Sequence, residues 1–327
     1  MGAVQASQVR HSAAARLALP RLPAGFRAHA ETGLDAMWQT HDELGASRPS
    51  ARLDGPSLLG LKAEIARRML RACVMCRHRC GVDRTAGAAG ICAVAAETRV
   101  YFAGLLVTEE GEISPSFSVF PAGCNFSCAF CCVRDENADP EHGEPLTARA
   151  VDRWLAVAEN RSARTISFIG GEPTVHLHAI LDMLARLRSP LPIAWNSNFY
   201  FSQETARLLD GVVDFYVADC HYGSDQCALR LAGAPDHFAT VTRNLRWAAE
   251  RSRLILRLLV LPGHMDCCTR PILEWAAAHL NAPVHVMCNY VPPRQGAPGE
   301  LGRALTAREI EEALACANDL GVNLIAP

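Results

Sequence analysis

Three cysteines, Cys124, Cys128 and Cys131, stand close together in the run Cys-Asn-Phe-Ser-Cys-Ala-Phe-Cys. Three thiolates on one short loop can bind three irons of a four-iron cluster and leave the fourth iron without a protein ligand. A substrate or cofactor can bind at that open iron, whereas an electron-transfer cluster normally closes it with a fourth cysteine. The spacing also differs from that of a zinc knuckle, in which cysteines tend to come as two C-x2-C pairs.

A second candidate site is the sequence Gly170-Gly171-Glu172-Pro173, which follows the apolar, strand-like run Thr165–Ile169. Two glycines let a backbone approach a ligand closely, and a carboxylate beside them can accept hydrogen bonds from an ammonium group. The turn comes one strand–helix unit after the cysteines. We therefore expect the two motifs at the same edge of a sheet.

Together the two motifs resemble the signature of the radical S-adenosylmethionine (SAM) superfamily. The resemblance implies a [4Fe-4S] cluster on the three cysteines, with SAM chelating the open iron through its amino and carboxylate groups. It also implies that the Gly-Gly-Glu turn holds the SAM amino group and that Phe130 contacts adenine. In this superfamily the reduced cluster cleaves SAM to a 5′-deoxyadenosyl radical, which abstracts hydrogen from a substrate. An electron donor such as flavodoxin or ferredoxin is then expected.

A closer resemblance covers roughly residues 58 to 321 and is to the radical SAM proteins labelled pyruvate formate-lyase activating enzyme-like. It rests on the cysteine segment that begins at Cys73 and on the later runs Trp195–Asn198 and Leu208–Asp214. It implies an oxidoreductase that activates a glycyl-radical enzyme. One departure is His221, which stands where this group usually has a lysine that reaches the SAM carboxylate. Histidine supplies only a titratable charge there.

Four polar residues near the expected strand ends are further candidate SAM contacts. Asn196 and Asn198 either bind the ribose hydroxyls or a cation beside the SAM carboxylate, or they form an ordinary turn. Asp219 ends the fourth expected strand. Arg257 lies inside an apolar strand, so its charge either points toward the cofactor or pairs with a carboxylate in the core.

The segment before the main motif carries four more cysteines, Cys73, Cys76, Cys80 and Cys92, in the pattern C-x2-C-x3-C-x11-C. Glycines between them permit the tight turns of a metal-binding loop. Four thiolates suit either tetrahedral zinc or a closed auxiliary iron–sulfur cluster, and the spacing does not choose between them. Reduced thiols packed in a small subdomain are the remaining alternative.

The other cysteines show no metal-binding spacing. Cys132 follows the main triplet directly and is interpreted as a bystander, because adjacent residues cannot easily bind one cluster. Cys267 and Cys268 are interpreted as free thiols, with a redox or radical-relay role as the alternative, and His264 as an ordinary loop histidine. The rest are Cys220, Cys227, Cys288 and Cys316.

The arrangement of apolar runs predicts an α/β fold. Six strand-like runs separated by helical patterns favour a parallel sheet that curls into a partial (β/α)6 barrel, as the superfamily resemblance also implies. We expect this barrel over residues 113–327, a cysteine-rich metal-binding subdomain over 56–112 and a partly disordered extension over 1–55. The strand-like runs are Phe117–Phe120, Thr165–Ile169, Pro192–Asn196, Val213–Asp219, Leu254–Val260 and Val284–Asn289.

The overall composition narrows the function classes. The formal net charge of −2 gives no sign of nucleic-acid or anionic-membrane binding. No apolar run approaches the roughly 20 residues of a membrane span. Fourteen cysteines without a signal-peptide pattern favour metal ligands in the reducing cytoplasm. The remaining alternatives are a glycyl-radical activase, a radical SAM enzyme that modifies a small molecule or peptide natural product, and a non-catalytic iron–sulfur or zinc protein.

Overall fold

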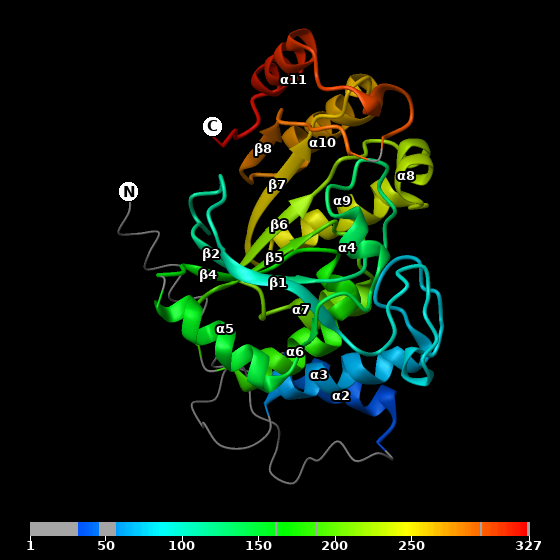
Figure 1. Ribbon diagram of the computed structural model, residues 1–327, viewed down its shortest axis with the longest axis vertical. Coiled ribbons are helices and arrows are strands. Elements are labelled where there is room, and N and C mark those ends of the chain that lie inside the picture. The colour runs from blue at the N-terminus through cyan, green and yellow to red at the C-terminus, as the bar shows by residue number, and fades with distance from the viewer. Residues whose placement is uncertain (1–31, 46–56, 161, 188, 295, 326–327) are drawn as a thin grey trace.

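The strands of the chain form one eight-stranded sheet in the order β3-β1-β2-β4-β5-β6-β7-β8 (Figure 1). The computed structural model describes residues 32–45, 57–160, 162–187, 189–294 and 296–325. Six neighbouring strands run parallel, and their order follows the order of the chain. They are β2 (Ser116–Pro121), β4 (Thr165–Phe168), β5 (Ile193–Ser197), β6 (Phe215–Asp219), β7 (Arg253–Leu259) and β8 (Val284–Met287).

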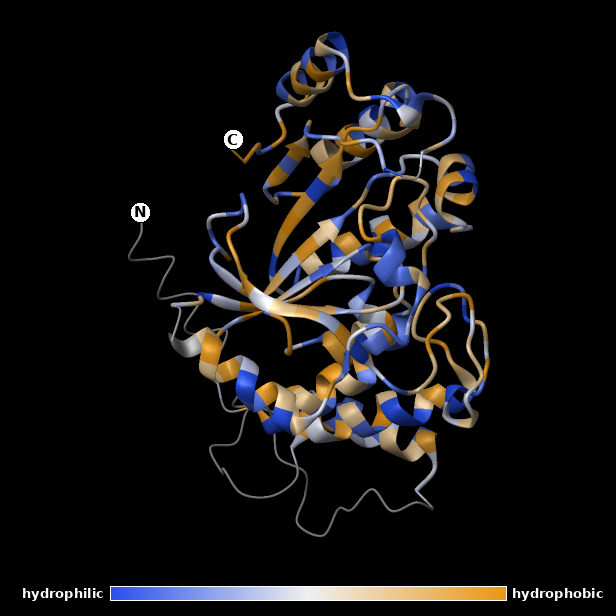
Figure 2. Ribbon diagram, in the orientation of Figure 1, coloured by the Kyte–Doolittle hydropathy of each residue, from blue (hydrophilic) through white to orange (hydrophobic). Residues whose placement is uncertain are grey.

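These six strands confirm the predicted α/β class and match the six strand-like runs. Every residue of β4 and β5 is buried, as expected for parallel strands that are covered on both faces. In Figure 2 the strands are coloured mainly hydrophobic, whereas the helices alternate between hydrophobic and hydrophilic residues. The sheet is open, with β3 and β8 at its two edges.

Two further strands were not predicted. β1 (Arg99–Leu106) pairs antiparallel with β2, and the short β3 (Glu144–Pro145) pairs antiparallel with β1. Most residues of β1 are only partly buried, although its sequence Arg-Val-Tyr-Phe-Ala-Gly-Leu-Leu is largely apolar. β1 comes from the region assigned to the cysteine-rich subdomain, yet it extends the sheet. The proposed domain boundaries stay predictions.

Helices follow the parallel strands and pack along the outside of the curved sheet (Figure 1). A capping box lies at the start of the last of them, where the side chains of Thr306 and Glu309 each accept from the other's backbone N–H. The helices are α5 (Ala148–Asn160), α6 (Leu177–Arg186), α7 (Gln203–Leu209), α8 (Asp225–Ala232), α9 (His237–Ala249), α10 (Arg270–His279) and α11 (Ala307–Asp319). Short helical turns lie at α4 (Arg134–Ala138), η3 (Pro173–His176), η4 (Met265–Thr269) and η5 (Gly299–Gly302).

The N-terminal part contributes two helices, α2 (Leu34–Gly45) and α3 (Leu58–Met69), and α3 packs against α6. The turns η1 (Leu70–Ala72) and η2 (Arg84–Ala86) follow within the cysteine-rich segment. Most of the extension predicted to be partly disordered lies outside the described residues. Its described part forms α2, whose residues Met37 and His41 are buried.

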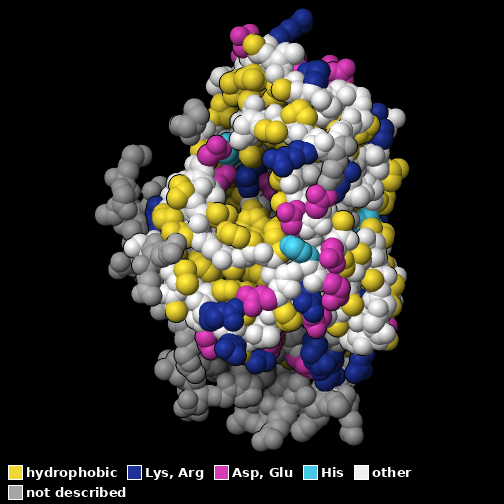
Figure 3. All heavy atoms as spheres, in the orientation of Figure 1, with side chains coloured by type: hydrophobic (Ala, Val, Ile, Leu, Met, Phe, Trp, Pro, Cys, Tyr) yellow, Lys and Arg dark blue, Asp and Glu magenta, His cyan; other side chains and the backbone are white. Residues whose placement is uncertain are grey.

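One face of the molecule is hollowed near its middle, where hydrophobic side chains gather between more strongly charged regions (Figure 3). Active sites of barrels built from parallel strands lie at the carboxyl ends of those strands, so the loops that follow the strands are the place to look for a site. Among the described helices, none combines the length and apolar character that a membrane-spanning segment needs.

Candidate active site

A cavity of about 420 Å³ lies at the carboxyl ends of the parallel strands. Its size falls within the range of small-molecule sites in proteins. The four cysteines of the N-terminal segment do not line it, whereas every other predicted site residue does. Those residues are Cys124, Cys128, Phe130, Cys131, Gly170, Gly171, Glu172, Asn196, Asn198, Asp219 and Arg257.

The loop that carries the three cysteines leaves β2 and is tied to the end of α8. The backbone N–H groups of Ser127 and Ala129 donate to the carbonyls of Ala232 (3.0 Å) and Leu231 (2.7 Å). The last carbonyls of a helix have no partner within the helix, so the loop satisfies two of them. These two hydrogen bonds hold the loop against the end of α8.

The three thiols occupy an environment that disfavours isolated thiolates. Burial raises the pKa of Cys124 and of Cys131, and burial together with the nearby Cys131 raises the pKa of Cys128 to about 12. Metal ligation requires the thiolate form, so a bound cation would have to supply the missing stabilisation. The backbone N–H of Phe126 donates to Cys124 Sγ (3.4 Å), and Asn137 Nδ2 donates to Cys131 Sγ (3.7 Å).

The arrangement fits an iron–sulfur cluster that also takes a ligand. Over the part of the chain that the structure describes, the three Sγ atoms do not form a group close enough to share one ion. In a cluster each thiolate binds a different iron, which needs wider spacing. One polar atom of a cavity-lining residue, Asn137 Oδ1, is buried without a hydrogen-bond partner among the described residues. Unpartnered buried polar atoms point to a missing ligand.

The Gly-Gly-Glu turn packs directly on the backbone that leads into the cysteine loop. The N–H of Gly171 donates to Pro121 O, and the N–H of Glu172 donates to Gly123 O, both at 3.0 Å. A Cβ atom on Gly171 would lie 1.9 Å from Gly123 O, and Gly170 adopts a left-handed φ of +93°. Sequence reasoning assigned these glycines to the approach of a ligand. The close approach that the structure shows is to the cysteine loop itself.

The carboxylate of Glu172 is buried and already holds three donors. It accepts from the N–H of Thr174 (2.9 Å), the hydroxyl of Ser197 (2.8 Å) and the N–H of Asn198 (2.9 Å). Burial raises its pKa, although these hydrogen bonds oppose the change. A carboxylate offers roughly four acceptor positions, so one remains for a further donor. Ser197 was not predicted as a site residue. The only indication in the sequence is that it carries a hydroxyl group and directly follows Asn196 at the end of a strand.

Asn198 links the glycine-rich turn to the cysteine loop. Its Nδ2 donates to Asn125 Oδ1 (2.7 Å), and its Oδ1 accepts from the N–H of Tyr200 (3.0 Å). The hydrogen bond from Tyr200 to Asn198 forms a turn, and a turn was the alternative role considered for Asn198. Asn125 was not predicted, although it directly follows Cys124. Its carbonyl also contacts His78 Nε2 (2.9 Å), which joins the N-terminal cysteine segment to the site.

Arg257 lines the cavity and also pairs with carboxylates. Two alternatives were considered for its charge, a position facing the cofactor and a pair with a core carboxylate, and the geometry combines them. Its Nη1 donates to Asn196 Oδ1 (2.6 Å) and lies 3.6 Å from Asp219 Oδ1. Its Nε lies 3.1 Å from Glu110 Oε1. Burial alone would raise the pKa of Glu110, but a hydrogen bond from His285 and the charge of Arg257 hold it at about 2. Glu110 was not predicted, because it precedes the barrel strands and gives no local signal.

His221 does not supply a lysine-like charge. The N–H of Leu259 donates to His221 Nδ1 (3.1 Å), which requires that nitrogen to be unprotonated. Burial further lowers the pKa of His221. The permanent positive charge among the described lining residues is therefore that of Arg257.

Aromatic side chains form one wall of the cavity. The ring of Phe130 is buried, and its centroid lies 5.9 Å from those of His221 and Tyr222 and 6.3 Å from that of Tyr290. Such a wall can hold the flat face of a purine base. Tyr222 and Tyr290 were not predicted. Both follow parallel strands, as the predicted residues do.

The N-terminal cysteines lie beside this site without entering it. Cys73, Cys76 and Cys92 are buried and Cys80 is exposed. Burial raises the pKa of Cys92, and the charges of Cys73 and Cys80 raise it further. Three of the four cysteines are therefore close enough to interact. The buried guanidinium of Arg84 donates to Cys73 Sγ (3.9 Å). A metal or cluster on these four cysteines stays a prediction.

We expect an Arg257→Met substitution to lower the free energy of unfolding by about 3 kcal/mol, because it leaves the buried Glu110 carboxylate without its cation. Arg253→Met is the matched control. It removes an arginine of the same strand whose ion pair with Glu112 (2.6 Å) is about one-third exposed, which should cost under about 1 kcal/mol. Urea unfolding under anaerobic conditions measures both values. Equal losses in the two variants would contradict this role for Arg257.

Comparisons with known proteins bear on the same residues. A model of the radical SAM superfamily matches residues 118–276. The uncharacterized protein MJ0674 of Methanocaldococcus jannaschii is 34% identical over 307 residues, which cover 89% of this chain and 90% of that protein.

Solved structures give more distant matches. A crystal structure of Streptococcus suis SuiB matches with 14% identity and a TM-score of 0.46, over 64% of this chain and 48% of that one. SuiB bound to the precursor peptide SuiA matches with 11% identity and a TM-score of 0.48, over 89% and 60% of the two chains. TYW1 with a lysine-pyruvate adduct bound matches with 14% identity and a TM-score of 0.41, over 63% and 72%. The chain thus spans about half the length of the first SuiB structure.

Proposed function

Because the chain belongs to the radical SAM superfamily, we propose that Cys124, Cys128 and Cys131 hold a [4Fe-4S] cluster beside a SAM-binding cavity. When bound, the cluster and SAM supply a 5′-deoxyadenosyl radical by reductive cleavage. The observation that carries the proposal is that the three cysteines and the Gly-Gly-Glu turn line one cavity. A metal-binding protein without catalytic function would have no need of this second motif at the open side of the cysteines.

The side chains around the cavity each have a task in this proposal. The remaining acceptor position of Glu172 takes the SAM ammonium group, and Arg257 provides positive charge for the SAM carboxylate. Phe130 and Tyr290 form the wall against which adenine lies, and both are buried. Their apolar surfaces keep water away from the reacting carbon.

The substrate that we favour is a backbone segment of a protein, as for an activase of a glycyl-radical enzyme. The cavity is about as large as one drug-sized ligand requires, so SAM leaves little room for a second small molecule. A substrate must then enter from the opening. Val291 marks that opening, because it lines the cavity although its side chain is 77% exposed. An extended segment can present a single glycine there.

Two further parts of the proposal concern the surroundings of the enzyme. A one-electron donor of the flavodoxin or ferredoxin type reduces the cluster. The reducing cytoplasm suits an oxygen-sensitive site with fourteen cysteines.

Incubation with a glycyl-radical enzyme from the same organism tests the substrate class. The protein, loaded with iron and sulfide, is mixed anaerobically with SAM, dithionite and that partner, and electron paramagnetic resonance follows the partner's radical. We expect an organic radical signal with the wild type and none with a Cys128→Ala variant. A modified small molecule or peptide, without any protein radical, would contradict the activase and support the alternative substrate class.

A further inference from the structure

Four potential metal ligands meet at a point where the sequence shows no metal-binding pattern. Cys227 lies in the first turn of α8, whereas His264, Cys267 and Cys268 lie in and just before the π-helical turn η4. Their ligand atoms all lie within 4.8 Å of one another, and Cys227, His264 and Cys268 are buried. Over the described part of the chain, this is the group of histidine, cysteine and acidic side chains placed closely enough to share one ion.

The three distances from His264 Nδ1 are close to the edge length of a metal-centred tetrahedron. His264 Nδ1 lies 3.2 Å from Cys267 Sγ, 3.7 Å from Cys227 Sγ and 4.0 Å from Cys268 Sγ. Ligands about 2.3 Å (sulfur) and about 2.0 Å (nitrogen) from a tetrahedral zinc ion stand roughly 3.6 Å apart. The three measured distances scatter around this value. We propose that Cys227, His264, Cys267 and Cys268 bind one Zn²⁺ ion.

The types and the spacing of these four ligands favour zinc over an iron–sulfur cluster. Three cysteines and one histidine are a common set for structural zinc. Thiolates favour zinc strongly over magnesium or calcium, which take oxygen ligands. A four-iron cluster would need the thiolates on different irons and therefore farther apart. The site therefore differs in kind from the triplet at Cys124.

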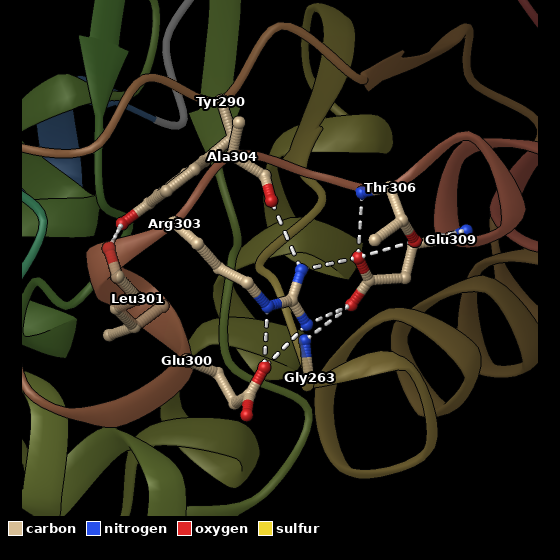
Figure 4. Close-up of polar contacts among 8 residues, drawn as sticks. All are labelled: Gly263, Tyr290, Glu300, Leu301, Arg303, Ala304, Thr306 and Glu309. Carbon is tan, nitrogen blue, oxygen red and sulfur yellow. Dashed lines mark hydrogen bonds and ion pairs between the residues drawn. The ribbon is translucent and has the colours of Figure 1, made fainter.

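Hydrogen bonds within the protein hold the two loops that carry the ligands. Ser224 caps α8 by accepting from the N–H of Cys227 (3.3 Å). The other loop is anchored at Gly263, whose N–H donates to Glu309 Oε1 (2.8 Å) of α11 (Figure 4). Figure 4 also shows Arg303 and Thr306 bound to the same carboxylate. His264 therefore directly follows a residue whose backbone N–H is held by α11.

The backbones of the loops also touch. A Cβ atom on Gly223 would lie 2.5 Å from Cys268 O, so only glycine allows this contact. Gly223 directly follows His221 and Tyr222, which line the cavity. A zinc ion here would tie the loop after β6 to the loop after β7 and thereby hold one wall of the cavity. The proposal itself needs no SAM chemistry.

Zinc counting tests the proposal. Elemental analysis of anaerobically purified protein would compare the wild type with a Cys227→Ser variant and with Cys288→Ser, a partly buried thiol outside the group. We expect Cys227→Ser to contain one zinc per chain fewer than the wild type, and Cys288→Ser to lose none. The difference is independent of any metal at Cys73–Cys92. Equal zinc in the wild type and a folded Cys227→Ser variant would overturn the proposal.

A second measurement needs only the wild type and remains decisive if Cys227→Ser does not fold. Cys267 and Cys288 are both partly exposed, so their alkylation rates can be followed by peptide mass spectrometry with and without a zinc chelator. We expect the chelator to accelerate labelling of Cys267 at least about tenfold and to leave Cys288 unchanged. Equal labelling of Cys267 with and without chelator, or a disulfide that includes it, would overturn the site.

Discussion

A Cys128→Ala variant is expected to purify with little of the cluster iron and to leave SAM uncleaved. Cys128 is the middle ligand of the proposed cluster, and its loop is held by α8 rather than by the metal. The fold should therefore survive the substitution while the cluster is lost. Iron and sulfide analysis after anaerobic reconstitution measures the loss, and circular dichroism checks that the helices remain.

Cys132→Ala is the matched control for this variant. Cys132 also lines the cavity and directly follows the triplet, but it is exposed and was interpreted as a bystander. We expect it to retain wild-type iron and sulfide. If Cys128→Ala kept its iron, or if Cys132→Ala lost as much, the assignment of the ligands would be wrong.

A Gly171→Ala variant is expected to lose SAM cleavage by more than about 100-fold. The added Cβ would lie 1.9 Å from Gly123 O and 2.7 Å from Asn137 Oδ1. Backbone oxygen cannot move aside as a flexible side chain can, so the turn must separate from the cysteine loop. A displacement of about 1 Å at a reacting centre is enough to cost 100-fold in rate. Overpacking should also lower the free energy of unfolding by about 1–3 kcal/mol.

Gly60→Ala separates this clash from a general effect of replacing glycine. Gly60 lies in α3, where a Cβ would meet only Ser57 Oγ at 3.7 Å, an ordinary contact. Alanine there should leave 5′-deoxyadenosine formation unchanged and should stabilise the helix by up to about 1 kcal/mol. If Gly171→Ala cleaved SAM as fast as Gly60→Ala, the close packing of the Gly-Gly-Glu turn on the cysteine loop would not be needed for SAM cleavage.

The parallel part of the fold could be predicted because its strands are buried on both faces. Such strands appear in a sequence as largely apolar runs, and Phe215–Asp219, with the sequence Phe-Tyr-Val-Ala-Asp, is of this kind. Residues that follow such strands must gather at one edge of the sheet. This is why Glu172 and Asp219, far apart in the chain, could both be placed near the cysteines.

Other features depend on contacts that no local pattern encodes. The run of β1, Arg-Val-Tyr-Phe-Ala-Gly-Leu-Leu, is itself strand-like, but its antiparallel pairing with β2 is a contact that the chain order does not reveal. Glu110 meets Arg257 only because β7 passes close to the loop after β1. Cys227 stands 37 residues before His264, so the four-ligand group exists only once β6 and β7 lie side by side. Cys267 and Cys268 were interpreted as free thiols, and the structure places them beside Cys227 and His264.

The assay for 5′-deoxyadenosine tests the central claim most directly. Reconstituted wild type is reduced with dithionite and given SAM, beside a variant in which Cys124, Cys128 and Cys131 are all alanine. The account predicts 5′-deoxyadenosine from the wild type only. A wild type that carries its full iron and sulfide and binds SAM, yet forms no 5′-deoxyadenosine with or without its protein substrate, would contradict it.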